Sequence, residues 1–455
     1  MADQVAATPS PGEGVSKLIS TYPHHWREII NGPLEEEFVQ LALSTLNELV
    51  QPDFVPTVEH VQLLLYLTIT PNVHPISPEL PLDILYRLVS LHHPMSFSQG
   101  IPIHPSSSGK NRENEPIWLQ WNYKRSDLHK SIWRCMRACR DEGVWALLWD
   151  KAAQVKAKTE RPRRSIEDDE EGDRKAHRNL STEGWKLLEW LVQFWEKDRS
   201  ERDLRENSIE YSPLFLKQLP RPFDRTGQLP RNDASIPISI LKAAYTTPSS
   251  KGEEGERRRS FAVNLLSLVI DTAIGPKAPF HPSSLSSSLV HSLRALPTND
   301  VLDVTKRLAR SRHWRTACHI LTLLIEDLGG IRSKKTEQRR AEHVSRGIDM
   351  DFEKNIDLDR PTAKYLLGEI VLLTPRDAHD VVKTTMFKVA LVSITKSHNY
   401  DAIAMEEVTA RYKDDVSWWN RVENTWRIEA VEEKKQSVYI GLLKRCIVDM
   451  LSNVR

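Results

Sequence analysis

Apolar residues recur every three or four positions through much of the chain, which is the spacing of one face of an α-helix. The first clear series contains Phe38, Leu41, Ala42, Leu46 and Leu49. Three glutamates lie just before it, in the expected first turn of the helix. The helix dipole favours negative charge at this N-terminal end. We therefore expect a helix that begins at Pro33 and ends before Pro52.

Residues 297–330 have the pattern of a helical hairpin. Asn299 or Asp300 is expected to cap a first helix, and Ser311 and Arg312 form a polar break before a second apolar series that ends at Gly329. The length is close to the period of about 34 residues in tetratricopeptide-type repeats, but no second copy follows at that spacing. The similarity is one of size and shape alone.

Similar series predict further helices across the rest of the chain. They lie at residues 57–70, 81–91, 126–149, 181–206, 238–245 and 261–274, and again after residue 361. Polar stretches interrupt them around Ser106, Ser165 and Gly252. We expect an all-α fold, an irregular stack of antiparallel helix pairs that is solenoid-like or a helical bundle, with polar disordered inserts.

Changes in composition divide the chain into six segments. Residues 156–180 carry a basic run followed by an acidic one, with Ile166 as the only large apolar side chain, which is typical of a linker. We predict a disordered N-terminal tail (1–20), an N-terminal helical region (21–155), a charged linker or insert (156–180), a central helical region with flexible inserts (181–330), a basic charged segment (331–360) and a C-terminal helical region (361–455).

The overall composition limits the cellular compartments in which we expect the protein, but it does not indicate an activity. Lys+Arg number 63 and Asp+Glu 62, so any nucleic-acid partner must meet a local patch. The four cysteines are too scattered for a disulfide framework, and residues 1–14 lack the pattern of a signal or transit peptide. The apolar stretches fall short of the roughly 20 residues that cross a bilayer. We expect a nuclear or cytoplasmic protein with no membrane partner.

The sequence contains none of the local signatures of catalysis or cofactor binding. P-loop, dinucleotide and activated-serine motifs are absent, and no short-spaced ligand pairs predict zinc. Cys135 and Cys139 share a helix face but are expected to be core thiols. We therefore expect no cofactor and no metal. The hypothesis that the protein is an enzyme requires residues distant in sequence to converge on one site, for example several of His60, His129, His313 and His319.

Two basic helix faces are candidate sites of nucleic-acid contact. Lys130, Arg134 and Arg137 fall on one face among tryptophans, and Lys306 and Arg310 lie one turn apart in the predicted hairpin. The alternative is that both faces are solvated or paired with local carboxylates.

Two serines are candidate phosphorylation sites. Ser165 and Ser260 each follow consecutive arginines in segments expected to be flexible and polar, where a phosphate would reverse the local charge.

These observations favour a non-catalytic helical scaffold or adaptor subunit of a larger intracellular assembly, placed in the nucleus in preference to the cytoplasm and bound to protein partners. The first alternative is a helical nucleic-acid-binding protein that uses the basic faces. The second, less favoured, is an enzyme with a site assembled from distant residues.

Overall fold

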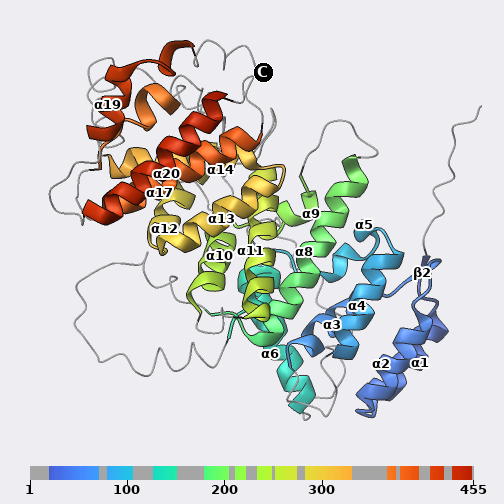
Figure 1. Ribbon diagram of the computed structural model, residues 1–455. Helices are drawn as coiled ribbons and strands as arrows, with labels where there is room; N and C mark the ends of the chain where they lie inside the picture. Colours follow the sequence, from blue (N-terminus) through green and yellow to red (C-terminus); the bar gives the residue numbers. More distant parts are fainter. Residues whose placement is uncertain are drawn as a thin grey trace, which may run out of the picture. The chain divides into compact units, whose positions relative to one another are not determined.

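The computed structural model (Figure 1) shows an all-α protein, as the apolar spacing predicts. It describes residues 20–70, 79–105, 127–150, 179–203, 211–221, 233–247, 252–273, 282–329, 366–375, 380–398, 410–424 and 433–452. The tail at 1–19, nearly all of the segment at 156–180, the segment at 331–360 and Ser165 lie outside these residues. The chain forms two compact units, and the six predicted segments stay a prediction.

The first unit comprises residues 1–102 and 110–147. Its elements are β1 (Ser20–Thr21), α1 (His24–Glu35), α2 (Val39–Leu49), β2 (Phe54–Val55), α3 (Val58–Thr68), α4 (Glu79–Leu91), α5 (Pro94–Phe97), η1 (Ser98–Gly100), α6 (Asp127–Glu142) and η3 (Gly143–Leu147). β1 and β2 form a two-residue parallel pair. Helix α3, buried along most of its length, packs against α4 and α6 and forms the centre of this unit.

The second unit comprises residues 103–109 and 148–455. Its elements are α8 (Thr182–Asp203), α9 (Pro213–Leu216), α10 (Ser235–Thr246), α11 (Glu253–Asp271), α12 (Pro282–Arg294), α13 (Thr298–Arg310), α14 (Trp314–Leu328), the π-helical turn η7 (Leu366–Ile370), α17 (Val381–Ser397), α19 (Val416–Asn424) and α20 (Glu433–Ser452). Consecutive helices pack in pairs, notably α10 with α11 and α13 with α14.

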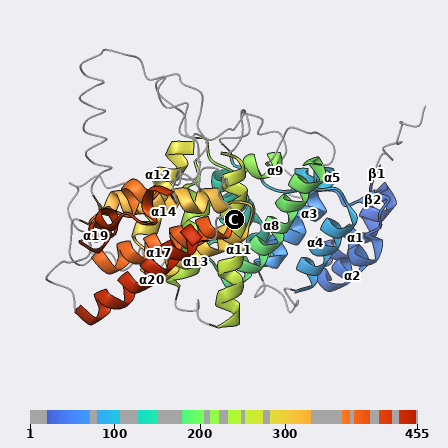
Figure 2. The same cartoon turned by 45° about the horizontal axis from the view of Figure 1, so that its top comes forward.

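Helix α17 is packed between other helices of the second unit. It contacts α13, α14 and α20, and Figure 2 shows α17, α13 and α20 side by side, as Figure 1 does. Its apolar residues lie on all sides rather than on one stripe, which is the pattern of a helix with partners all round. Phe387 and Leu391 are fully buried.

The predicted start of the helix at Pro33 is wrong. Pro33 lies inside α1, and the chain breaks between α1 and α2 instead. Glu37 adopts a left-handed φ of 63°, while the amide of Phe38 donates to the carbonyl of Pro33 and that of Glu37 to Leu34. This pair of hydrogen bonds is the Schellman motif that commonly ends helices, so a glutamate and not the proline separates the two helices.

The prediction of a polar insert before residue 261 is also wrong, because most of that stretch is helical. Gly252 caps α11, and Ser260 lies inside that helix. Glu253, Glu254 and Glu256 occupy the first turn, where the helix dipole favours them. Phosphorylation of Ser260 stays a prediction, but the flexible segment on which it was based is a helix.

The hairpin prediction holds, with a different cap. Helices α13 and α14 are separated by three residues at the expected polar break. Pro297 stands at the N-cap position and no side chain caps the helix, so Asn299 and Asp300 lie in its first turn.

Candidate partner-binding groove

An open groove with a volume of about 700 Å³ lies among α13, α17 and α20. Its lining residues are Leu302, Thr305, Lys306, Ala309 and Arg310 from α13, Met386, Val389, Ala390, Ser393, Ile394, Ser397 and His398 from α17 and its C-terminal end, and Leu442 from α20. Most of the lining surface is apolar. Such a surface is costly to leave in water, so it is a candidate contact site for a partner.

The apolar part of the groove is contributed mainly by α17. Met386, Val389 and Ala390 are only partly buried, although the opposite side of the helix is fully enclosed. Leu442 of α20 adds a side chain that is 44% exposed. Neighbouring elements therefore cover the apolar residues of α17, except on the side that faces the groove.

The hydroxyl groups in the groove are already hydrogen-bonded within the protein. Thr305 donates to the carbonyls of Val301 and Leu302, and Ser397 donates to the carbonyl of Ser393. Ser393 Oγ lies 3.8 Å from Cys446 Sγ. The groove thus offers few polar groups to a ligand.

Two cations stand at the α13 edge of the groove. Lys306 and Arg310 are both exposed and lie one helical turn apart. Neither has an ion-pair partner among the described residues, and none of the lining residues is acidic. The structure therefore brings these two predicted residues to the edge of an apolar surface, a combination that the sequence did not indicate.

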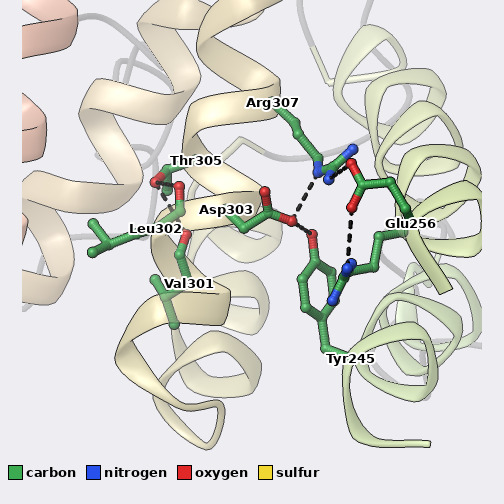
Figure 3. A network of polar contacts seen from close by, with 8 residues as sticks. Tyr245, Glu256, Val301, Leu302, Asp303, Thr305 and Arg307 are labelled. Atoms are coloured by element: carbon green, nitrogen blue, oxygen red, sulfur yellow. Dashed lines mark hydrogen bonds and ion pairs between the residues drawn. The ribbon is translucent and has the colours of Figure 1, made fainter. Parts of the chain in front are cut away.

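The neighbouring basic residue of α13 is used internally. Arg307 Nε donates to Asp303 Oδ2 at 2.8 Å and also pairs with Glu256 of α11 (Figure 3). Tyr245 donates to the same oxygen of Asp303 at 2.8 Å. Burial raises the pKa of Asp303, but the hydrogen bonds from Arg307 and Tyr245 outweigh it and hold that pKa below its usual value.

Figure 3 also shows side chains on two different sides of α13. Asp303 and Arg307 point toward Tyr245 and Glu256, whereas Leu302 extends away from this network. The network ties α13 to α10 and α11 and so fixes the orientation in which Lys306 and Arg310 reach the groove.

The other predicted basic face lies on α6 in the first unit. Lys130, Arg134 and Arg137 are exposed there. Trp133, 47% exposed, lies beside them, and the guanidinium of Arg137 stands 5.5 Å from its ring centre, within the range of a cation–π contact. The face combines positive charge with an exposed aromatic ring.

Sequence reasoning missed a buried ionic cluster around Asp271 in the second unit. Asp271 Oδ2 accepts from Arg199 Nη1 at 2.9 Å and pairs with Arg312, and its Oδ1 lies 3.2 Å from His313 Nε2. Burial, the largest effect, raises the pKa of the nearby Glu196. Arg199 is 72 residues from Asp271, so no local signal could have joined them. The cluster links α8, α11 and the turn before α14.

A buried lysine on α17 was also missed. Lys388 is 2% exposed, and its Nζ donates to the carbonyls of Val371 at 2.8 Å and Leu373 at 2.6 Å. Burial lowers its pKa from 10.5 to about 7. The residue ties α17 to the end of η7. It does not line the groove.

We expect the free energy of unfolding to rise as the pH increases from about 7 to about 10.5 because of Lys388. In this window the unfolded chain still holds the lysine proton and the folded chain has released it, so raising the pH favours folding. Below this window both states hold the proton, and the full penalty of the buried charge applies. Urea unfolding of the wild type and Lys388→Met across this range measures the effect, expected to be a few kcal/mol. Parallel pH curves for the two chains would contradict it.

Two of the histidines named as candidate catalytic groups, His60 and His313, have separate structural partners. His60 in the first unit contacts Thr57 and Asn31, and burial, aided by Arg27, lowers its pKa to about 4. His313 belongs to the Asp271 cluster of the second unit. His319 is part of α14, and the side chain of His129 lies outside the described residues.

Cys135 and Cys139 are buried thiols on α6. Within the described ranges, no group of three or more histidine, cysteine or acidic residues could hold a metal ion. Among the helices that the structure describes, none is long and apolar enough to cross a membrane.

Comparisons with models of known protein families and with curated proteins find no match to this sequence.

Proposed function

We propose that this chain is a non-catalytic scaffold or adaptor subunit of a protein assembly in the nucleus or cytoplasm. The observation that carries the proposal is the groove among α13, α17 and α20, where apolar surface is exposed beside two cations that form no ion pair with any residue the structure describes. In contrast, Arg307 and Arg312 are paired within the fold. An apolar surface with adjoining charge is the usual composition of a protein-binding site.

Affinity capture of the tagged full chain from its native cells, with and without nuclease, tests this proposal. We expect a set of proteins in fixed stoichiometry that survives nuclease treatment and moderate salt. A chain that is recovered without any protein partner would overturn the proposal, and so would turnover of a small substrate by the purified chain.

Nucleic-acid binding is a second candidate function, favoured by the α6 face. Lys130, Arg134 and Arg137 are exposed on one side of that helix, beside an exposed Trp133. Basic side chains contact phosphates, and an aromatic ring stacks on bases.

The salt dependence of binding distinguishes this second candidate. We expect log K for a single-stranded oligonucleotide to fall with log salt concentration with a slope of about −2, because each phosphate contact releases counterions. Arg134→Glu with Arg137→Glu should abolish the binding. The matched control, Lys217→Glu with Arg421→Glu, reverses two exposed charges elsewhere. Equal losses in both variants, or a flat salt dependence, would exclude this face.

A further inference from the structure

We infer that the groove among α13, α17 and α20 binds an acidic amphipathic helix of a partner protein. This inference rests on the proposed function and adds the chemistry of the partner. It follows from three properties of the groove: its apolar floor, its internally hydrogen-bonded hydroxyls and its two cations, which pair with no acidic group in the described part of the chain.

The floor requires apolar side chains from the partner. Met386, Val389, Ala390 and Leu442 present partly exposed apolar surface, and covering it removes that surface from water. The lining on α17 extends from Met386 to His398, about 18 Å at 1.5 Å per residue. That length corresponds to roughly three turns of a bound helix, so the partner is expected to place apolar residues at positions i, i+3 or i+4, and i+7.

The hydrogen-bonding state of the groove favours a helix over an extended peptide. Thr305 and Ser397 already donate within their own helices. An extended strand would therefore press backbone amides and carbonyls against a surface that cannot satisfy them. A helix satisfies its own backbone, so it can cover this groove without that penalty.

The charge at the edge of the groove selects acidic partners. Lys306 and Arg310 lie one turn apart and line the groove together, so two carboxylates one turn apart on the partner helix can face them. A basic partner would place like charges at the same edge, which disfavours binding. A small ligand is disfavoured because its orientation needs several convergent polar groups.

The test measures the binding of a labelled helical peptide of about four turns to the full chain by fluorescence anisotropy. The probe carries leucines on one face and glutamates beside them, and a twin peptide carries lysine in place of every glutamate. We expect the acidic probe to bind and the basic twin to bind at least about tenfold more weakly.

Two variants of the chain locate the binding. Lys306→Glu with Arg310→Glu should weaken the binding of the acidic probe by at least about tenfold and strengthen the binding of the basic twin. Ala390→Trp, which fills the floor, should abolish the binding of both peptides. The control Lys217→Glu with Arg421→Glu makes the same change in net charge on exposed residues outside the groove and should leave both affinities within about twofold. Circular dichroism checks that each variant is folded.

Several outcomes would overturn the inference. They are equal binding of the two peptides, no binding of the acidic probe, or no effect of Lys306→Glu with Arg310→Glu in a folded chain. Stronger binding of a peptide with the chain's own residues 347–359, where Ile348, Met350 and Phe352 alternate with acidic residues, would replace the partner with a segment of this protein. Light scattering measures self-association of the chain. Self-association that Ala390→Trp abolishes would show that the groove binds a second copy of this chain and not a helix of another protein.

The same variants separate this inference from the proposed function. If wild-type chain captures a stoichiometric assembly and Ala390→Trp captures it equally well, the scaffold proposal stands and the groove is not its binding site. If wild-type chain captures no protein, the scaffold proposal fails, whatever the peptides do.

Discussion

Replacing Gly184 by alanine is expected to lower the free energy of unfolding by about 3 kcal/mol. Gly184 lies in the first turn of α8, where a Cβ atom would stand 2.2 Å from the carbonyl oxygen of Leu148 and 2.8 Å from Ser181 Oγ. The first of these is a backbone atom and cannot rotate away. It also accepts a hydrogen bond from the amide of Ser181 at 3.0 Å, so relief of the clash must break the hydrogen bond that joins Leu148 to the start of α8.

The gain in helix propensity, about 1 kcal/mol for alanine over glycine, does not offset this clash. Gly441 in α20 provides the matched control because a Cβ atom there meets nothing within 4 Å. Gly441→Ala should raise the free energy of unfolding by about 0.5–1 kcal/mol. Urea unfolding followed by tryptophan fluorescence measures both variants. Stabilisation by both substitutions would show that the backbone at residue 148 adapts freely.

The substitution Asp271→Asn is expected to cost about 2–3 kcal/mol of stability. The carboxylate is 3% exposed and is the common partner of Arg199, Arg312 and His313. Asparagine keeps the shape but removes the negative charge, which leaves three basic groups together in a partly buried site. Arg199 and Arg312 retain some exposure to water, which is why the expected cost stays below that of a fully buried pair.

Asp327→Asn makes the same chemical change at a surface pair. Asp327 accepts from Arg294 at the same distance of 2.9 Å, but Arg294 is 60% exposed. We expect this substitution to cost less than about 1 kcal/mol. Thermal and urea unfolding of the two variants, compared with wild type, give the difference. Equal costs would show that burial does not set the strength of the Asp271 cluster.

The α13–α14 hairpin was predictable because its information is local. Each helix has one apolar stripe, and the polar break between them is three residues long. The start of α11 was not predictable in the same way. Its charged residues resemble a solvated linker, but Arg258 pairs with Glu254 four residues earlier, and Arg257 pairs with the distant Glu189. Composition alone does not distinguish paired charges from solvated ones.

The candidate site shows the same limit. Sequence reasoning selected Lys306 and Arg310 from their spacing on one helix face. It could not separate them from Arg307, whose partner Glu256 lies on another helix, or predict the groove, because Met386 and Leu442 come from elements far along the chain. Lys388 gave no signal either, because a lysine within an apolar series is ordinarily solvated.

The position of α17 under α20 has a consequence for how the protein is made. Leu443 and Ile447 of α20 are buried, and Lys396 of α17 pairs with Asp449. During synthesis, α17 is complete well before residues 433–452 exist, so one apolar side of this helix lacks its cover until the last turns are translated. Nascent chains stalled before residue 433 should therefore bind general chaperones through α17, and release from them should depend on α20.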